Sequence, residues 1–97
     1  MKRIRRDELM SIVLTAGDRD LILQHTFVDG ELRTQLDKGI EAGRVKLKIL
    51  LTPDGLNELL EWIAAGANHA ESQALESRLD VLYDKLVTVE KSLDVYE

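Results

Sequence analysis

Seven apolar side chains in the last quarter of the chain recur at alternating intervals of four and three residues: Leu75, Leu79, Leu82, Leu86, Val89, Leu93 and Tyr96. This spacing places all seven on one side of an α-helix and matches the heptad pattern of helices that pack side by side. The sequence therefore predicts a long amphipathic helix over residues 70–95, whose apolar stripe has to be covered. The chain has 97 residues, which suffice for one domain and not for two.

Two ways of covering this stripe are open. Val81 and Val95 widen it beyond a strict seam, which favours packing of the helix against its own domain. Alternatively, two copies associate through the stripe, with Lys85 and Glu90 at flanking positions where ion pairs between helices form. An interface would also stabilise a domain this small, which buries only a modest share of its surface. We expect a homodimer, with the seven stripe residues as its interface candidates.

Two segments have the composition of β-strands. Residues 44–51 read Arg-Val-Lys-Leu-Lys-Ile-Leu-Leu, and this alternation of cationic and apolar side chains predicts a half-buried strand with a cationic open face. Residues 10–14 are rich in β-branched and apolar side chains, which favours a second strand. About thirty residues separate the two, so parallel pairing through a right-handed crossover is one arrangement that they allow.

Helix-start signals follow both predicted strands. Thr15 and Thr52 each precede an apolar-periodic stretch and are suited to cap a helix, and Pro53 suits a first helical position. We predict helices over residues 16–26 and from Pro53 onward, the latter either separate from the C-terminal helix or continuous with it. Between them, a helix from about Asp29 to Gly43 would present three apolar residues on one stripe: Leu32, Leu36 and Ile40.

The predicted fold is therefore α+β and mostly helical, with two short strands, about four helices and a long amphipathic C-terminal helix. We expect residues 1–97 to form a single domain. Within it, residues 1–8 are a basic N-terminal segment, residues 10–51 a strand-helix-helix-strand unit and residues 53–97 a helical half.

Charge is unevenly distributed along the chain. Thirteen Lys and Arg against eighteen Asp and Glu give a net charge of −5. Residues 1–50 hold ten of the basic and eight of the acidic side chains, whereas residues 51–97 hold three and ten. Halves of opposite sign can attract each other within one chain or between copies. The negative net charge disfavours nucleic acid and anionic membranes as general partners.

Several function classes are excluded or disfavoured by what the sequence lacks. No run approaches the roughly 20 apolar residues that a membrane-spanning helix needs. No secretory-length apolar segment follows the basic residues 1–6, so we expect a cytoplasmic location and no membrane partner. The sequence contains no cysteine, which excludes disulfides and thiolate metal sites.

Basic side chains in two segments are weak candidates for binding an anion or a nucleic acid: Lys2, Arg3, Arg5, Arg6, Arg44, Lys46 and Lys48. Together they would support an alternative function as a nucleic-acid-associated regulator. The aromatic residues that stack on single-stranded bases lie elsewhere in the sequence, and lysines on an exposed strand also prevent edge-to-edge aggregation. We therefore expect these residues to serve solubility, with nucleic acid disfavoured.

The two histidines, His25 and His69, are the only residues that suggest a metal site. His69-Ala70-Glu71 matches the start of a zinc-deaminase signature, whose second half needs cysteines that this sequence lacks. We expect His69 to lie with Asn68 at a helix junction, and we expect solvated carboxylates at Glu8, Glu41, Glu58, Glu61 and Glu76. Neither catalytic residues nor cofactors are predicted, and a small metal-dependent enzyme at His69 is the weakest alternative.

Three segments together form one further motif. They are Leu51-Thr52 with Leu56, Leu59 and Leu60; residues 64–69, which read Ala-Ala-Gly-Ala-Asn-His; and Leu75 with Leu79-Asp80. Together with residues 20–26 they resemble a family of small bacterial proteins that read Leu-Thr-x-x-x-Leu and Ala-Ala-Glu-Ala-Asn-His and end in a leucine-rich helix. The chain departs from that family at Gly66, where glutamate is frequent, and it lacks the lysine-rich start of the last helix. The resemblance covers more than half of the chain and implies a domain, but no activity is assigned to the family.

The sequence as a whole favours a non-enzymatic protein-interaction or regulatory module. We expect it to self-associate through its C-terminal helix, and a different protein partner is the other partner class that remains open.

Overall fold

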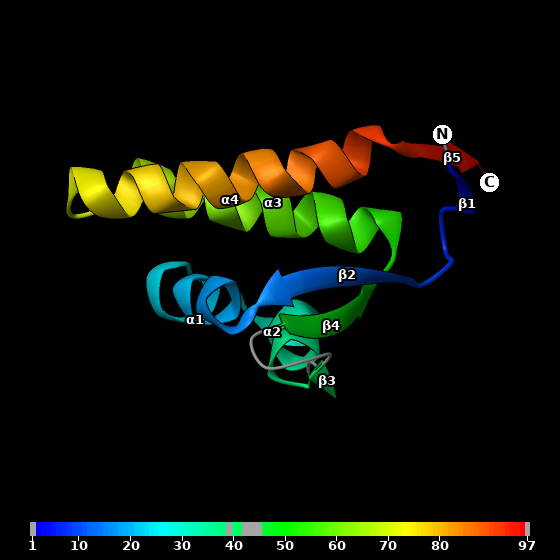
Figure 1. Ribbon diagram of the computed structural model, residues 1–97, viewed down its shortest axis with the longest axis horizontal. Helices are drawn as coiled ribbons and strands as arrows, with labels where there is room; N and C mark the ends of the chain where they lie inside the picture. Colours follow the sequence, from blue (N-terminus) through cyan, green and yellow to red (C-terminus); the bar gives the residue numbers. More distant parts are fainter. Residues whose placement is uncertain (1, 39, 42–45, 97) are drawn as a thin grey trace.

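The computed structural model of the chain describes residues 2–38, 40–41 and 46–96, and in them it confirms an α+β, mostly helical fold (Figure 1). The elements follow in the order β1 (Lys2–Arg5), β2 (Met10–Thr15), α1 (Ala16–His25), α2 (Gly30–Asp37), β3 (Ile40–Glu41), β4 (Lys46–Leu51), α3 (Pro53–Asn68), α4 (Gln73–Lys91) and β5 (Leu93–Tyr96). None of the helices in the described ranges combines the length and the apolarity that crossing a bilayer requires.

Both predicted strands exist, as β2 and β4, but they pair antiparallel, with Ile12 opposite Ile49. The parallel arrangement is therefore wrong. The antiparallel pairing arises because a further strand, β3, lies between α2 and β4 in the chain. It pairs antiparallel with the other side of β4 and completes a sheet of order β2-β4-β3. The two helices after β2 thus lead to β3, which runs in the same direction as β2, and β4 returns between the two. A strand of two residues carries no periodic pattern by which the sequence could have revealed it.

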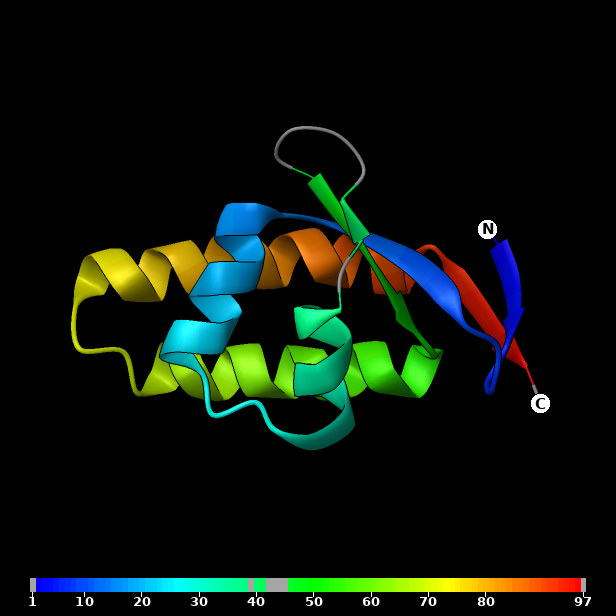
Figure 2. The ribbon, with the colours of Figure 1, turned by 90° about the horizontal axis from the view of Figure 1, so that it is seen from below.

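A second, two-stranded sheet joins β1 and β5 in parallel, with Ile4 opposite Val95, and brings both ends of the described chain together (Figures 1 and 2). The C-terminal helix accordingly ends at Lys91, and the prediction that it reaches residue 95 is wrong. Pairing with β1 holds the last residues extended. The backbone N–H of Arg6 donates to the carbonyl of Tyr96 at 2.9 Å, and the guanidinium of Arg3 lies 4.5 Å from the Tyr96 ring centroid.

The predicted helix starts at the two threonines are confirmed. Thr15 Oγ1 accepts the backbone N–H of Asp18 at 2.9 Å, while the Asp18 carboxylate accepts the N–H of Thr15, so α1 opens with a reciprocal capping box. Thr52 Oγ1 likewise accepts the N–H of Gly55 at 3.0 Å, with Pro53 at the first position of α3.

Two helix boundaries differ from the prediction. α2 ends at Asp37, so Ile40 belongs to β3 and not to the helix, and the predicted stop at Gly43 lies outside the described residues. α3 and α4 are separate helices, because the chain turns after His69 and Ser72 starts a new helix by accepting the N–H of Leu75 at 3.1 Å.

The core lies between the sheet and the helices. α3 and α4 run side by side in opposite directions and form a layer over β2 and β4, while α1 packs against β2 and α2 against β4 (Figures 1 and 2). On the inner face of the sheet the alternate side chains of both strands are buried: Met10, Ile12, Leu14, Leu47, Ile49 and Leu51. All of these except Leu47 belong to one core cluster with Leu56, Leu59 and Ile63 of α3, none of which is exposed. The helices thus supply the cover that so small a sheet requires.

One ion pair links the start of α1 to α4. Lys85 Nζ lies 2.9 Å from the Asp18 carboxylate, which is also part of the capping box of α1. Partial burial alone would raise the pKa of Asp18. The hydrogen bonds from Lys85 and from the Thr15 backbone, with the Lys85 charge, outweigh it and hold the pKa below the usual 3.8.

This lowered pKa gives a prediction for stability in acid. A carboxylate that is more acidic in the folded chain stabilises it above the unfolded-state pKa, and this contribution is lost as the pH falls through the lowered folded-state pKa. We expect Lys85→Met to lower the free energy of unfolding by about 0.5–1 kcal/mol at neutral pH, because the pair is partly exposed. The difference from wild type should shrink to nothing in acid, measured by urea unfolding at a series of pH values. A pH-independent difference, as expected for the control Lys91→Met, would contradict the assignment.

Candidate functional sites

The C-terminal stripe is covered from within the chain. Leu79, Leu82 and Leu86 are at most 2 % exposed and pack in the same core as α3 and the sheet. The remaining candidates are less deeply placed: Leu75, Val89 and Leu93 are half-buried against this core, and Tyr96 is exposed on β5. Lys85 pairs with Asp18 of its own chain. Of the two ways of covering the stripe, the structure contains the intramolecular one.

The basic candidates within the described residues lie in two parts of the fold. Arg3 and Arg5 lie exposed on β1, 3.8 Å from Asp94 and 3.6 Å from Asp7 respectively, at the end of the molecule where the chain ends meet. Lys2 belongs to the same strand and Arg6 follows it directly. Lys46 and Lys48 are exposed on β4, in the other sheet, and Arg44 lies outside the described residues. The structure therefore places the two basic segments on separate sheets.

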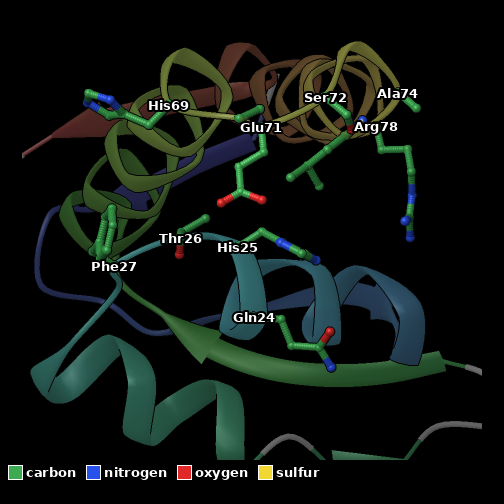
Figure 3. A pocket seen from close by; sticks show the side chains of 11 residues that line it. Gln24, His25, Thr26, Phe27, His69, Glu71, Ser72, Ala74 and Arg78 are labelled. Carbon is green, nitrogen blue, oxygen red and sulfur yellow. Dashed lines mark hydrogen bonds between the residues drawn. The ribbon is translucent and has the colours of Figure 1, made fainter.

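Both histidines line one open cavity of about 650 Å³ between the end of α1 and the start of α4 (Figure 3). The Glu71 carboxylate points into this cavity toward Thr26 and His25, and Arg78 lies across from them on α4. The His69 ring, in contrast, points away from the ring of His25. No local pattern in the sequence places the two histidines near one cavity, because the turn between α3 and α4 is what brings His69 there.

This histidine cavity offers no ligand set for a metal. Within residues 2–38, 40–41 and 46–96, no three His, Cys, Asp or Glu side chains lie close enough together to hold one. His69 occupies the helix junction expected of it, as the residue that ends α3, and its backbone N–H donates to the carbonyls of Ala65 and Gly66. The structure thus adds no support to a metal-dependent reaction at His69.

The outer face of β2 and β4 is exposed and carries apolar side chains. We call the exposed side chains of β2 and β4 the open sheet face: Ser11, Val13, Lys46, Lys48 and Leu50. Val13 is 44 % exposed and lies opposite Lys48, while Leu50 is 43 % exposed and lies opposite Ser11. Leu9, just before β2, is 57 % exposed. One residue in the sequence could have indicated this apolar surface. Leu50 stands where the alternation of residues 44–51 would place another cationic side chain on the open face of the strand.

Carboxylates gather at the Leu50 end of this face. A pocket of about 320 Å³ between β4, α2 and the first turns of α3 is lined by Leu9 and Leu50 and by three acidic residues, Glu31, Asp54 and Glu58. We call it the acidic pocket. All three acidic side chains of the pocket are exposed. The expectation of solvated carboxylates is thereby confirmed for Glu58, and Glu8, Glu61 and Glu76 are exposed as well. The open sheet face therefore carries Lys46 and Lys48 on β4 and the apolar side chains of Val13 and Leu50, and Leu50 also lines the acidic pocket, whose carboxylates belong to α2 and α3.

Fold and surface together define a small, mostly helical α+β protein in which the outer face of β2 and β4 is exposed. Comparison of the chain with protein-family models, with curated proteins and with solved structures found no match. The resemblance to the family with the Ala-Asn-His motif therefore stays a prediction.

Gly66 has a structural role at the contact between α1 and α3. Gly66 is buried where α3 passes the end of α1, and a Cβ atom there would lie 2.9 Å from Thr26 Cγ2 and 3.0 Å from the carbonyl oxygen of His25. Glutamate at this position would require α1 to move away from α3. The close approach of these two helices thus requires glycine at this position.

Proposed function

We propose that this protein is a non-enzymatic protein-interaction module that binds its partner through the open sheet face. The observation that carries the proposal is the exposure of three large apolar side chains on and beside one sheet face: Leu9, Val13 and Leu50. Exposed apolar side chains that gather in one place, with polar groups around them, are typical of protein-binding surfaces. Lys46, Lys48 and the acidic pocket supply such a polar surround.

The C-terminal stripe is a weaker basis for binding. Leu79, Leu82 and Leu86 would have to leave their own core to face a partner, and each buried leucine contributes roughly 2–5 kcal/mol to stability. The open sheet face, in contrast, can be covered without any rearrangement of the chain. In this proposal α4 supports the module from inside, and the contact surface lies on the opposite side of the sheet.

A protein partner also suits the charges better than a nucleic acid does. Lys46 and Lys48 alone would attract phosphates, but the pocket lined by Leu50 also holds three carboxylates, which repel them. A protein surface can present both signs of charge and apolar side chains together. The mixed face therefore favours protein over nucleic acid.

Site-specific photo-crosslinking in cells tests the proposal. A photoreactive amino acid at Ser11, which lies on the open sheet face, is expected to form an adduct with a protein, and the same group at the exposed Val81 on α4 is not. Leu50→Lys should abolish the Ser11 adduct while circular dichroism and the unfolding midpoint stay unchanged, because Leu50 is not part of the core. No adduct at Ser11, or an adduct that survives Leu50→Lys, would contradict the proposal.

A further inference from the structure

We infer that Asp29 is a site of spontaneous covalent modification, at which the folded chain isomerises to isoaspartate through a succinimide formed with Gly30. The sequence contains two Asp-Gly pairs, Asp29-Gly30 and Asp54-Gly55. The local structure favours the reaction at the first pair and hinders it at the second. The inference is independent of the proposed function, because it concerns the entry to α2 and not the open sheet face.

The reaction joins two atoms of neighbouring residues. The nitrogen of Gly30 attacks Cγ of the protonated Asp29 carboxyl, a bond forms between these two atoms, and the amide proton leaves with the carboxyl hydroxyl as one water molecule. A water molecule then opens the five-membered ring. Cleavage between the nitrogen and Cγ restores aspartate. Cleavage between the nitrogen and the main-chain carbonyl carbon leaves isoaspartate, in which the chain continues through Cβ and Cγ.

The side chain of Asp29 lies beside the nitrogen that would attack it. Its Oδ1 atom accepts the N–H of Gly30 at 2.7 Å. The other three helices begin differently, because Thr15, Thr52 and Ser72 each accept the N–H three residues further along the chain, as helix caps usually do. The carboxyl of Asp29 is thus held next to the Gly30 nitrogen, and a reaction within one chain is favoured where the reacting groups are held close together.

The main chain at this pair does not have helical geometry. Asp29 is extended, with a φ of −145° and a ψ of 174°, and Gly30 has a φ of 68°, which glycine adopts far more readily than other residues. Both residues are exposed. Ring closure requires rotation about the bond between Cα and the carbonyl carbon of Asp29. Because neither residue has the dihedral angles of a helix, this bond is not fixed as it is within a helical turn.

The second pair lies inside a helix. Asp54 and Gly55 belong to the first turn of α3, where the N–H of Gly55 donates to Thr52 Oγ1 at 3.0 Å. A Cβ atom on Gly55 would lie 3.5 Å from Leu51 Cβ, so this turn packs closely on the strand before it. Ring closure at Asp54 would require the Gly55 nitrogen to leave its hydrogen bond and the first turn to unwind. The reaction at Asp54 is therefore slow as long as the chain is folded.

Isoaspartate at position 29 changes the entry to α2. It lengthens the main chain by one carbon atom and leaves the free carboxylate on Cα. Val28 is 3 % and Leu32 4 % exposed, so the added atom has to be accommodated between two anchored residues. Leu32 also lines the acidic pocket, together with Glu31. We expect the modified chain to unfold at a lower urea concentration than the unmodified chain.

Incubation of the full chain in water enriched in oxygen-18 tests the inference. The chain is kept folded for several weeks at neutral pH and physiological temperature, and trypsin then releases residues 20–33 and residues 49–78 as separate peptides. Mass spectrometry with electron-transfer fragmentation should detect isoaspartate carrying oxygen-18 at position 29. At position 54 it should form at least about tenfold more slowly, a difference of about 1.4 kcal/mol in the barrier.

The matched control is the same chain unfolded in guanidinium chloride, in which both pairs should react at similar rates because both are Asp-Gly. Two variants extend the comparison. Asp29→Asn should form the same succinimide faster, because an amide does not have to be protonated first, whereas Asp54→Asn should remain slow in the folded chain. The inference is overturned if the two pairs react equally fast in the folded chain. It is also overturned if position 29 stays unmodified in the folded chain while both positions react in denaturant.

Discussion

A chain in which lysine replaces both Leu82 and Leu86 is expected to unfold, and not merely to lose a partner. Leu82 is 2 % and Leu86 0 % exposed, and both pack in the central core. Removing two such side chains costs roughly 4–10 kcal/mol, and the burial of two ammonium groups adds to that cost. Because a domain is stable by about 5–15 kcal/mol in total, little folded protein should remain. Circular dichroism would show the loss of helix.

The matched control for this double variant is Val81→Lys. Val81 lies on the same helix between the buried leucines but is 70 % exposed, so we expect a change of at most about 0.5 kcal/mol in the free energy of unfolding. A Leu82→Lys/Leu86→Lys chain that keeps its helical signal and sediments at half the mass of wild type would contradict this. It would mean that the C-terminal stripe is an interface between copies.

Gly66→Ala is expected to destabilise the chain by about 1–3 kcal/mol, although alanine usually favours a helix. The added Cβ would lie 2.9 Å from Thr26 Cγ2 and 3.0 Å from the carbonyl oxygen of His25, and the latter is backbone that cannot turn aside. The Thr26 side chain is fixed in its rotamer, because its hydroxyl donates a hydrogen bond to the carbonyl of Ile22 at 2.7 Å. Relief of the overlap therefore requires α1 and α3 to separate. Chemical denaturation measures the loss directly.

Two variants test the close approach of the helices at Gly66. Gly17→Ala, in the exposed first turn of α1, is expected to be neutral or to stabilise by up to about 1 kcal/mol, since its nearest neighbour would be Thr15 Oγ1 at 3.7 Å. Thr26→Ser removes the Cγ2 methyl group and should recover part of the loss when combined with Gly66→Ala. If Gly66→Ala is as stable as wild type, α1 and α3 are not held in tight contact at this position.

The fold class could be predicted because the spacing of apolar residues that marks a helix or a strand is set by residues close together in the sequence. The alternation in residues 44–51 and the threonines before α1 and α3 are sufficient for β4 and for two helix starts. The end of α4 could not be predicted in the same way. Leu93 and Tyr96 continue the spacing of four and three, and only pairing with β1, some ninety residues earlier, makes this segment a strand.

The candidate surface was harder to predict than the fold. A periodic stripe shows that side chains share one face, but it does not show whether the chain itself covers that face, and for Leu79, Leu82 and Leu86 it does. The acidic pocket combines side chains from three elements that only the tertiary structure brings together. The sequence shows that Leu50 is an apolar residue on an otherwise cationic strand face. It does not show whether another part of the chain covers that face, and this decides whether Leu50 is exposed.

The parallel pairing of β1 with β5 has a mechanical consequence. Tension applied through the chain would pull β1 from its Lys2 end and β5 from its Tyr96 end, which are opposite ends of the two paired strands. The strands would then be sheared along each other, so all the hydrogen bonds of the ladder would resist together and would not break one by one. We therefore expect the four residue pairs between β1 and β5 to bear the applied force first, so that the helices are not stretched until these two strands separate.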